Sequence, residues 1–153
     1  MQTTVVEEDP AFVTALIENV HMVRWLHTPT VFEVRAVSKD VDRAYRTVGG
    51  PLVCVAVVPA GVDPPTDHAR QLMMEELERL MKVSRAVHFV IEGSGFRHVM
   101  LRSVVTGLIM VAGRRGRILV NASLEEALRA ESPAHVKNVP SMLAAAVAKG
   151  IVR

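Results

Sequence analysis

The chain has 153 residues, a length that fits one domain, and half of them are hydrophobic although only 4% are aromatic. Lysine and arginine number 18 against 16 aspartates and glutamates, and so small an excess argues against a nucleic-acid-binding protein. The single cysteine, Cys54, excludes an internal disulfide and a cysteine-based zinc site. The mean hydropathy of +0.26 fits either an efficient core or apolar surface covered by a second subunit.

The N-terminal segment, MQTTVVEEDP, is acidic and lacks the apolar region of a signal peptide. The longest mostly apolar helical stretch, residues 99–112, is interrupted by Arg102 and is shorter than the roughly 20 residues that span a bilayer. We therefore expect a cytoplasmic protein without membrane insertion.

The first fifty residues carry mixed signals. Residues 1–10 resemble a frayed tail, and residues 11–26 space their apolar side chains as a helix does, although the part from Val20 onward also suits a strand. Residues 31–37 alternate like a short strand. We expect these residues to form an extension or lobe packed on the rest of the chain.

Capping and turn residues predict where one helix in the segment before residue 50 begins and ends. Ser38 is a suitable cap for a helix over residues 40–47. The Gly49-Gly50-Pro51 sequence is predicted to end that helix.

From residue 52 onward, strand patterns and helix patterns alternate. The run at residues 52–58 is continuously apolar and rich in β-branched residues, which is typical of a strand buried on both faces. The predicted elements are strands at 52–58, 86–91 and 117–121, with helices at 67–83 (capped by Thr66), 99–112, 124–130 (capped by Ser123) and 141–149. This order predicts an α/β fold with parallel neighbouring strands, with residues 51–153 as the main domain.

A Gly93-Ser94-Gly95 turn joins the strand at 86–91 to the next helix. His98 stands where a dinucleotide-binding loop needs a third glycine, and no Gly-Lys-Ser or Gly-Lys-Thr is present. The glycines adjoin Ser94 directly, whereas a nucleophile elbow places them two residues away. Two interpretations remain: a tight turn that needs glycine for its geometry, or an anion site at a helix N-terminus, supported by Arg97, His98 and Arg102.

No catalytic or metal-binding set can be assembled from spacing. No two histidines have the i, i+4 spacing of a helical zinc site, so we expect neither a metal nor a cofactor. His88 is expected to be a core histidine with satisfied hydrogen bonds, and Cys54 a buried thiol. Glu92 ends a strand, where α/β proteins often place functional side chains. A catalytic pair would require Glu92 and His98 to converge in one pocket.

The segment from residue 50 to about 130 resembles the STAS class, the sulfate-transporter and anti-sigma-factor-antagonist domains, together with the lipid-binding-like proteins grouped near them. The resemblance lies in the order and spacing of the elements and in the Ser123-Leu124-Glu125-Glu126-Ala127-Leu128 stretch. It implies a mixed sheet with helices packed against it. In bacterial anti-sigma antagonists, a partner kinase phosphorylates a serine at the start of the helix after the central strand, and Ser103 matches it by position.

The chain also departs from that family motif. The residue before Ser103 is Arg102 rather than an acidic residue, and the next glycine is Gly107. The surroundings of Ser103 therefore differ from the sequence that such a kinase recognises.

Three functions from different classes follow. The leading hypothesis is a non-enzymatic bacterial regulatory or scaffolding module that acts through protein–protein contact, with a kinase or another signalling protein as partner and a homo-oligomer, preferably a dimer. Its interface would use the helix at 99–112 and the basic residues Arg97, Arg102, Arg114 and Arg115. The alternative is a domain that binds a small molecule, a nucleotide or a lipid, with an anion near Gly93 and Gly95. The third is an enzyme that uses Glu92 and His98.

Overall fold

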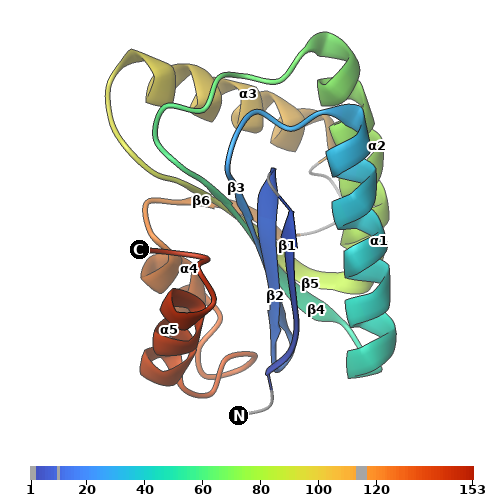
Figure 1. The fold of residues 1–153 in the computed structure, drawn as a ribbon, viewed down its shortest axis with the longest axis vertical. Helices are drawn as coiled ribbons and strands as arrows, with labels where there is room; N and C mark the ends of the chain where they lie inside the picture. Colours follow the sequence, from blue (N-terminus) through green and yellow to red (C-terminus); the bar gives the residue numbers. More distant parts are fainter. Residues whose placement is uncertain (1–2, 10, 113–116) are drawn as a thin grey trace.

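The computed structural model describes residues 3–9, 11–112 and 117–153, which form a mixed six-stranded sheet with helices on both faces (Figure 1). The strands are β1 (Thr3–Asp9), β2 (Phe12–Ile17), β3 (Val20–Trp25), β4 (Leu52–Val58), β5 (Ser84–Ile91) and β6 (Arg117–Asn121). The helices are α1 (Val31–Val48), α2 (Asp67–Val83), α3 (Phe96–Ala112), α4 (Leu124–Ala130) and α5 (Val139–Ala148). The predicted α/β class with a mixed sheet is confirmed.

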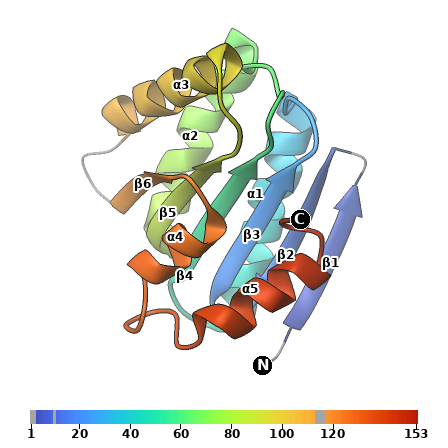
Figure 2. The same ribbon diagram turned by 90° about the vertical axis from the view of Figure 1, so that its left-hand side faces the viewer.

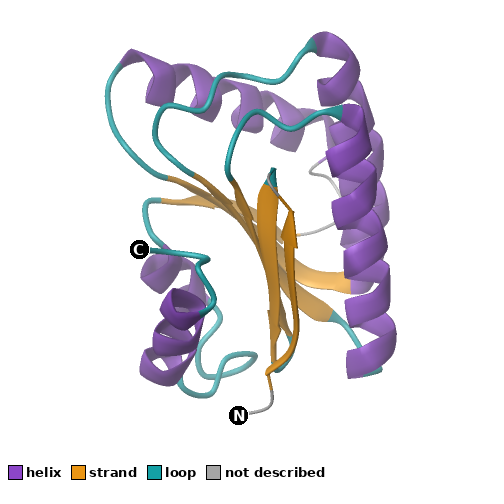
Figure 3. Cartoon of the chain, in the orientation of Figure 1, coloured by secondary structure: helices purple, strands orange, loops and turns teal. Residues whose placement is uncertain are grey.

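The six strands lie side by side in chain order. Strands β1 to β3 are antiparallel, whereas β3 to β6 are parallel to one another. Helices α1 and α2 cover one face of the sheet, and α4 and α5 cover the other (Figure 3). Helix α3 lies across one end of the sheet, beyond α2 (Figure 2).

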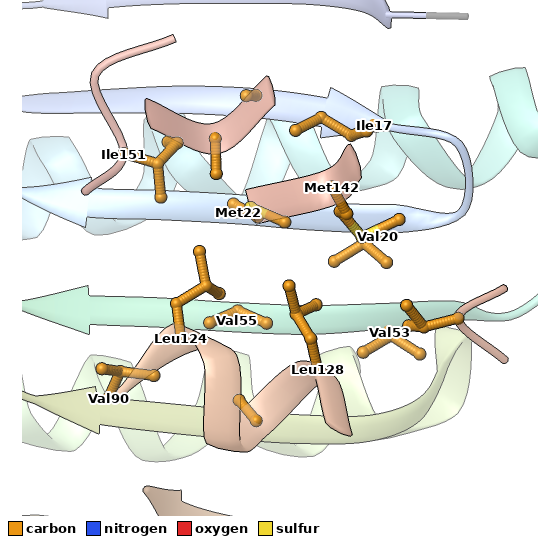
Figure 4. Close-up of a cluster of buried hydrophobic side chains, with 14 of the residues drawn as sticks. Ile17, Val20, Met22, Val53, Val55, Val90, Leu124, Leu128, Met142 and Ile151 are labelled. Carbon is orange, nitrogen blue, oxygen red and sulfur yellow. The ribbon is translucent and has the colours of Figure 1, made fainter. Parts of the chain in front are cut away.

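Two apolar clusters lie on opposite faces of the central strands. Val53, Val55 and Val57 of β4 belong to the cluster beneath α4 and α5, which also contains Leu124 and Leu128 (Figure 4). Leu52 and Cys54 of the same strand belong to the cluster beneath α1, α2 and α3. Strand β4 is thus buried on both faces, as its continuous apolar run predicted.

The predictions of a tail over residues 1–10 and of a helix over residues 11–26 were wrong, whereas the alternative of a strand from Val20 onward is confirmed. Thr3–Asp9 is a paired strand rather than a tail, and residues 12–25 form two strands rather than a helix. The chain reverses at Glu18, whose φ of 54° places it in the left-handed region. Nearly every side chain of β2 and β3 is buried, because helices cover both faces there. Burial on both faces removes the polar–apolar alternation by which strands are normally recognised.

The prediction of a strand at 31–37 followed by a separate helix was also wrong. Residues 31–48 form the single helix α1. The helix begins after Thr30, whose backbone N–H donates to the Glu33 carboxylate as in a capping box. The predicted end at Gly49 is confirmed, with the left-handed φ of 73° that glycine adopts freely.

The later elements follow the sequence pattern closely. The predicted bounds of β4, α2, β6 and α4 are confirmed, and the Thr66 and Ser123 hydroxyls accept the expected backbone hydrogen bonds. Strand β5 begins two residues earlier than predicted, α3 three residues earlier and α5 two residues earlier. Strands β1 to β3 belong to the same sheet as β4, and the division of the chain at residue 50 stays a prediction.

The described part of the chain contains no helix that could span a membrane. Among the helices of residues 3–9, 11–112 and 117–153, none combines the length and apolar composition that a bilayer span requires.

A buried hydrogen bond between His21 and Asp40 joins β3 to α1. His21 Nε2 and Asp40 Oδ2 lie 2.7 Å apart, and both side chains are almost fully buried. Burial by itself raises the pKa of Asp40, but the hydrogen bond and charge of His21, with smaller contributions from Thr14 and Arg43, outweigh it and hold that pKa below its ordinary value. The ionised carboxylate therefore stabilises the folded chain.

We predict that Asp40→Asn lowers the free energy of unfolding by about 1–3 kcal/mol at neutral pH, because it weakens a buried charged hydrogen bond. The pKa of Asp40 is lower in the folded chain than its ordinary 3.8, so its contribution is complete above that value and is lost as the pH falls through the lowered pKa. Urea unfolding of both proteins from neutral to strongly acidic pH measures the difference, which should shrink at the acidic end.

Asp67→Asn is the matched control, because the Asp67 side chain is 94% exposed. It should lower the free energy of unfolding much less than Asp40→Asn does. A stability difference at Asp40 that does not change with pH would contradict the assignment.

Candidate functional site

The Gly93–Gly95 turn lies between the carboxyl end of β5 and the start of α3. Gly93 has a φ of 94°, and a Cβ atom added to it would lie 2.7 Å from the Cβ atom of Ala60. Gly95 has a φ of 91°, but an added Cβ atom would have open space around it. The geometric interpretation of the turn therefore accounts for Gly93, which permits close approach to the loop between β4 and α2.

Of the residues predicted to form the anion site, the structure describes the side chains of His98 and Arg102 near the start of α3. Val99 N–H donates to Gly95 O at 3.1 Å, so the helix begins directly at the turn. His98 is half-buried, and its Nδ1 atom has no hydrogen-bond partner among the described residues. Arg102 is exposed one turn later. Arg114 and Arg115 lie outside the described residues, as does the Arg97 side chain, and the anion site stays a prediction.

Glu92 is paired with Arg24 rather than with His98. The Glu92 carboxylate accepts a hydrogen bond from Arg24 Nη2 at 2.9 Å, and Arg24 Nη1 donates to Ile151 O at 3.1 Å. Glu92 and Arg24 line a hollow of about 490 Å³ at the carboxyl ends of β3 and β4, and His98 is not among its lining residues. The ion pair neutralises the one carboxylate that the catalytic hypothesis needed.

His88 is a core histidine with both ring nitrogens satisfied, as predicted. Its Nδ1 atom lies 2.7 Å from Asn121 Oδ1, and its Nε2 atom lies 2.8 Å from Glu131 Oε1. Arg117 donates to the other Glu131 oxygen at 3.2 Å. Glu131 did not emerge from the sequence, because it is 43 residues from His88 and no spacing rule connects them.

Metal-binding side chains do not cluster in the part of the chain that the structure describes. Residues 3–9, 11–112 and 117–153 contain no group of three or more histidines, cysteines, aspartates or glutamates that could hold a metal ion.

A cavity of about 110 Å³ lies between the sheet and helices α1 and α2. Its walls are mainly apolar and include Val23 and Trp25 of β3, Ala56 of β4 and Phe89 of β5. The sequence hinted at it only through the small number of aromatic residues available to fill the interior.

Two side chains on the cavity wall have well-defined neighbours. The ring of Trp25 meets that of Phe12 edge to face, with 5.8 Å between centroids. Cys54 is a buried thiol, as predicted, and burial raises its pKa to about 12 despite a hydrogen bond with Ser84. Such a thiol is unreactive at neutral pH.

Helix α3 turns one face away from the rest of the molecule. Val99 is 59% exposed and Met110 is 77% exposed. Ser103 and Thr106 are also exposed and share that face through the i, i+4, i+7, i+11 spacing. On the opposite side, Leu101 and Val105 are buried in the core.

Ser103 lies inside this helix rather than at its start. Because α3 begins at Phe96, Ser103 is about two turns from the N-terminus, which corrects the placement implied by the family resemblance. Its Oγ atom donates to Val99 O at 3.0 Å. The side chain is accessible, and its phosphorylation stays a prediction.

Comparison of the chain with protein-family models, with curated proteins and with solved structures gives no match. The resemblance to STAS domains therefore stays a prediction based on the order of the elements.

We predict that Gly93→Ala destabilises the protein more than Gly95→Ala does. Both substitutions force a side chain into a positive φ, at a cost of about 1–2 kcal/mol. Only Gly93→Ala also meets Ala60, and that overlap adds about 1–3 kcal/mol. Urea unfolding of the two variants measures the difference, and equal losses would show that the contact with Ala60 does not constrain the turn.

Proposed function

We propose that the protein is a non-enzymatic regulatory or scaffolding module, similar in plan to STAS domains, that binds another protein through the outer face of α3. We define the outer face of α3 by its exposed residues Val99, Met100, Arg102, Ser103, Thr106, Gly107 and Met110. The observation that carries the proposal is the pair of large apolar side chains, Val99 and Met110, left uncovered on one helix face.

The charge of α3 favours a partner with acidic groups. The helix sequence contains Arg97 and Arg102 but no aspartate or glutamate. A partner surface with an apolar centre and an acidic rim would complement this face, and charge complementarity mainly adds specificity and association rate. A second copy of the chain would place Arg102 against the same basic surface, so a different protein suits this face better.

The partner that we propose is a signalling protein, and a kinase remains one option from the family resemblance. A phosphate on Ser103 would add nearly two negative charges beside Arg102 and oppose an acidic partner. The modification would have to break the hydrogen bond from Ser103 to Val99 O. A homodimer formed through another surface and a cytoplasmic location are further parts of this proposal, and light scattering of the purified chain tests the first.

We predict that a photo-crosslinking amino acid at position 110 captures one discrete protein in the cells that naturally make this chain. The same amino acid at Phe32, which is 82% exposed on α1, should capture none. The yield at position 110 should fall about tenfold with Arg102→Glu, equivalent to about 1.4 kcal/mol of binding.

Arg35→Glu, at an exposed position of α1, is the matched charge control and should leave the yield unchanged. Circular dichroism should show that all variants are folded. Equal capture at positions 32 and 110, or capture only of a second copy of the chain, would contradict the proposed interface.

A further inference from the structure

We propose that the cavity between α1, α2 and the sheet binds a small, uncharged, mainly apolar molecule about the size of one aromatic ring. The cavity is separate from the outer face of α3, because none of the α3 residues whose side chains the structure describes lines it. The proposal is therefore independent of the protein partner.

The size and walls of the cavity define the body of this ligand. The cavity has a volume of about 110 Å³ and is partly open to solvent, whereas the engineered apolar cavities of about 150 Å³ that bind benzene are enclosed. Val23, Ala56 and Phe89 project into it from three adjacent strands, and Val37, Met73 and Leu77 from the two helices. Because a buried water needs two to four polar partners, walls of this kind favour an apolar occupant over water.

The mouth of the cavity is polar, and its charges exclude a ligand that carries a negative charge. Ser38 Oγ of α1 donates to Glu76 Oε2 of α2 at 2.8 Å, and Arg79 Nη1 donates to the same carboxylate at 3.0 Å. Arg79 Nη2 also donates to Asp42 Oδ2 at 3.1 Å. The two carboxylates outnumber the one guanidinium, so an anionic ligand is repelled, whereas a ligand hydroxyl can donate to Glu76.

The remaining ionisable groups on the walls do not change this preference. His21 lines the cavity, and its Nε2 atom lies 2.7 Å from Asp40 Oδ2. The Cys54 thiol stays neutral, since it is buried and paired with Ser84. His21 is engaged by Asp40 and Cys54 is neutral, so selection against a charged ligand rests on the polar residues at the mouth.

A route into the cavity runs between α1 and α2. The Arg79 and Asp42 side chains that bridge the two helices are 57% and 45% exposed. Exposed ion pairs contribute little to stability, so this bridge can open at low cost. A ligand can thus enter without unfolding either helix.

Thermal unfolding of the full chain with benzene, phenol and benzoate tests the proposal. A ligand that binds only the folded state raises the melting temperature by mass action. We expect a saturable increase with benzene and with phenol, which has a hydroxyl for Glu76, and no increase with benzoate. The absence of a saturable shift with both uncharged probes, or an equal shift with benzoate, would overturn the proposal.

Two cavity-filling variants locate the binding site. Ala56→Ile adds three carbons from the central strand, and Val37→Leu adds one from α1 in case the first variant does not fold. Either folded variant should reduce or abolish the benzene shift. Ala36→Ile, at an exposed position of the same helix as Val37, is the matched control and should retain it. A benzene shift that persists unchanged in both filled variants would place binding elsewhere and overturn the assignment.

The benzene experiment and the cross-linking experiment test the cavity and the α3 interface separately. Cross-linking from position 110 should be unaffected by Ala56→Ile, and the benzene shift should be unaffected by Arg102→Glu.

Discussion

The rest of this structure depends on one constraint: each parallel strand lies directly beside the strand that precedes it in the chain. Strands β3 to β6 lie in chain order, and crossovers between parallel strands are right-handed in nearly all proteins. Successive right-handed crossovers in one direction place their helices on the same face, which is why α1 and α2 pack side by side. The opposite face is left for α4 and α5, which follow the last strand (Figure 1).

The helices on this side of the sheet form two different apolar surfaces, a cavity between α1 and α2 and an exposed face on α3. Helices α1 and α2 lie over the middle of the sheet, where valine-rich walls and few aromatic residues leave a cavity between them. Helix α3 lies at the end of the row and is anchored by Leu101 and Val105, while Val99 and Met110 on its other face stay largely exposed. The same succession of crossovers thus produces both an apolar cavity between two helices and an exposed apolar helix face.

The sequence predicts most reliably those elements whose signals are local. The apolar run of β4 and the capping residues Thr66 and Ser123 define their elements without reference to the rest of the chain. Strand β2 was predicted as helical and β3 was left open between helix and strand, because their burial on both faces depends on tertiary packing against α1 and α5. The turn glycines were recognised, but the contact that constrains Gly93 comes from Ala60 in another loop. Likewise, Arg24 and Glu92 are 68 residues apart, and only the folded sheet brings them together.

The position of Trp25 gives the protein a built-in optical probe. It is the single tryptophan of the chain, it is only 7% exposed, and it stands on the cavity wall against Phe12. Its fluorescence therefore arises from one place, the junction of β3 with α1, with no background from other indoles. Changes in the packing of that junction can be followed by emission wavelength and lifetime in the unmodified protein, without a label that would itself disturb a cavity of this size.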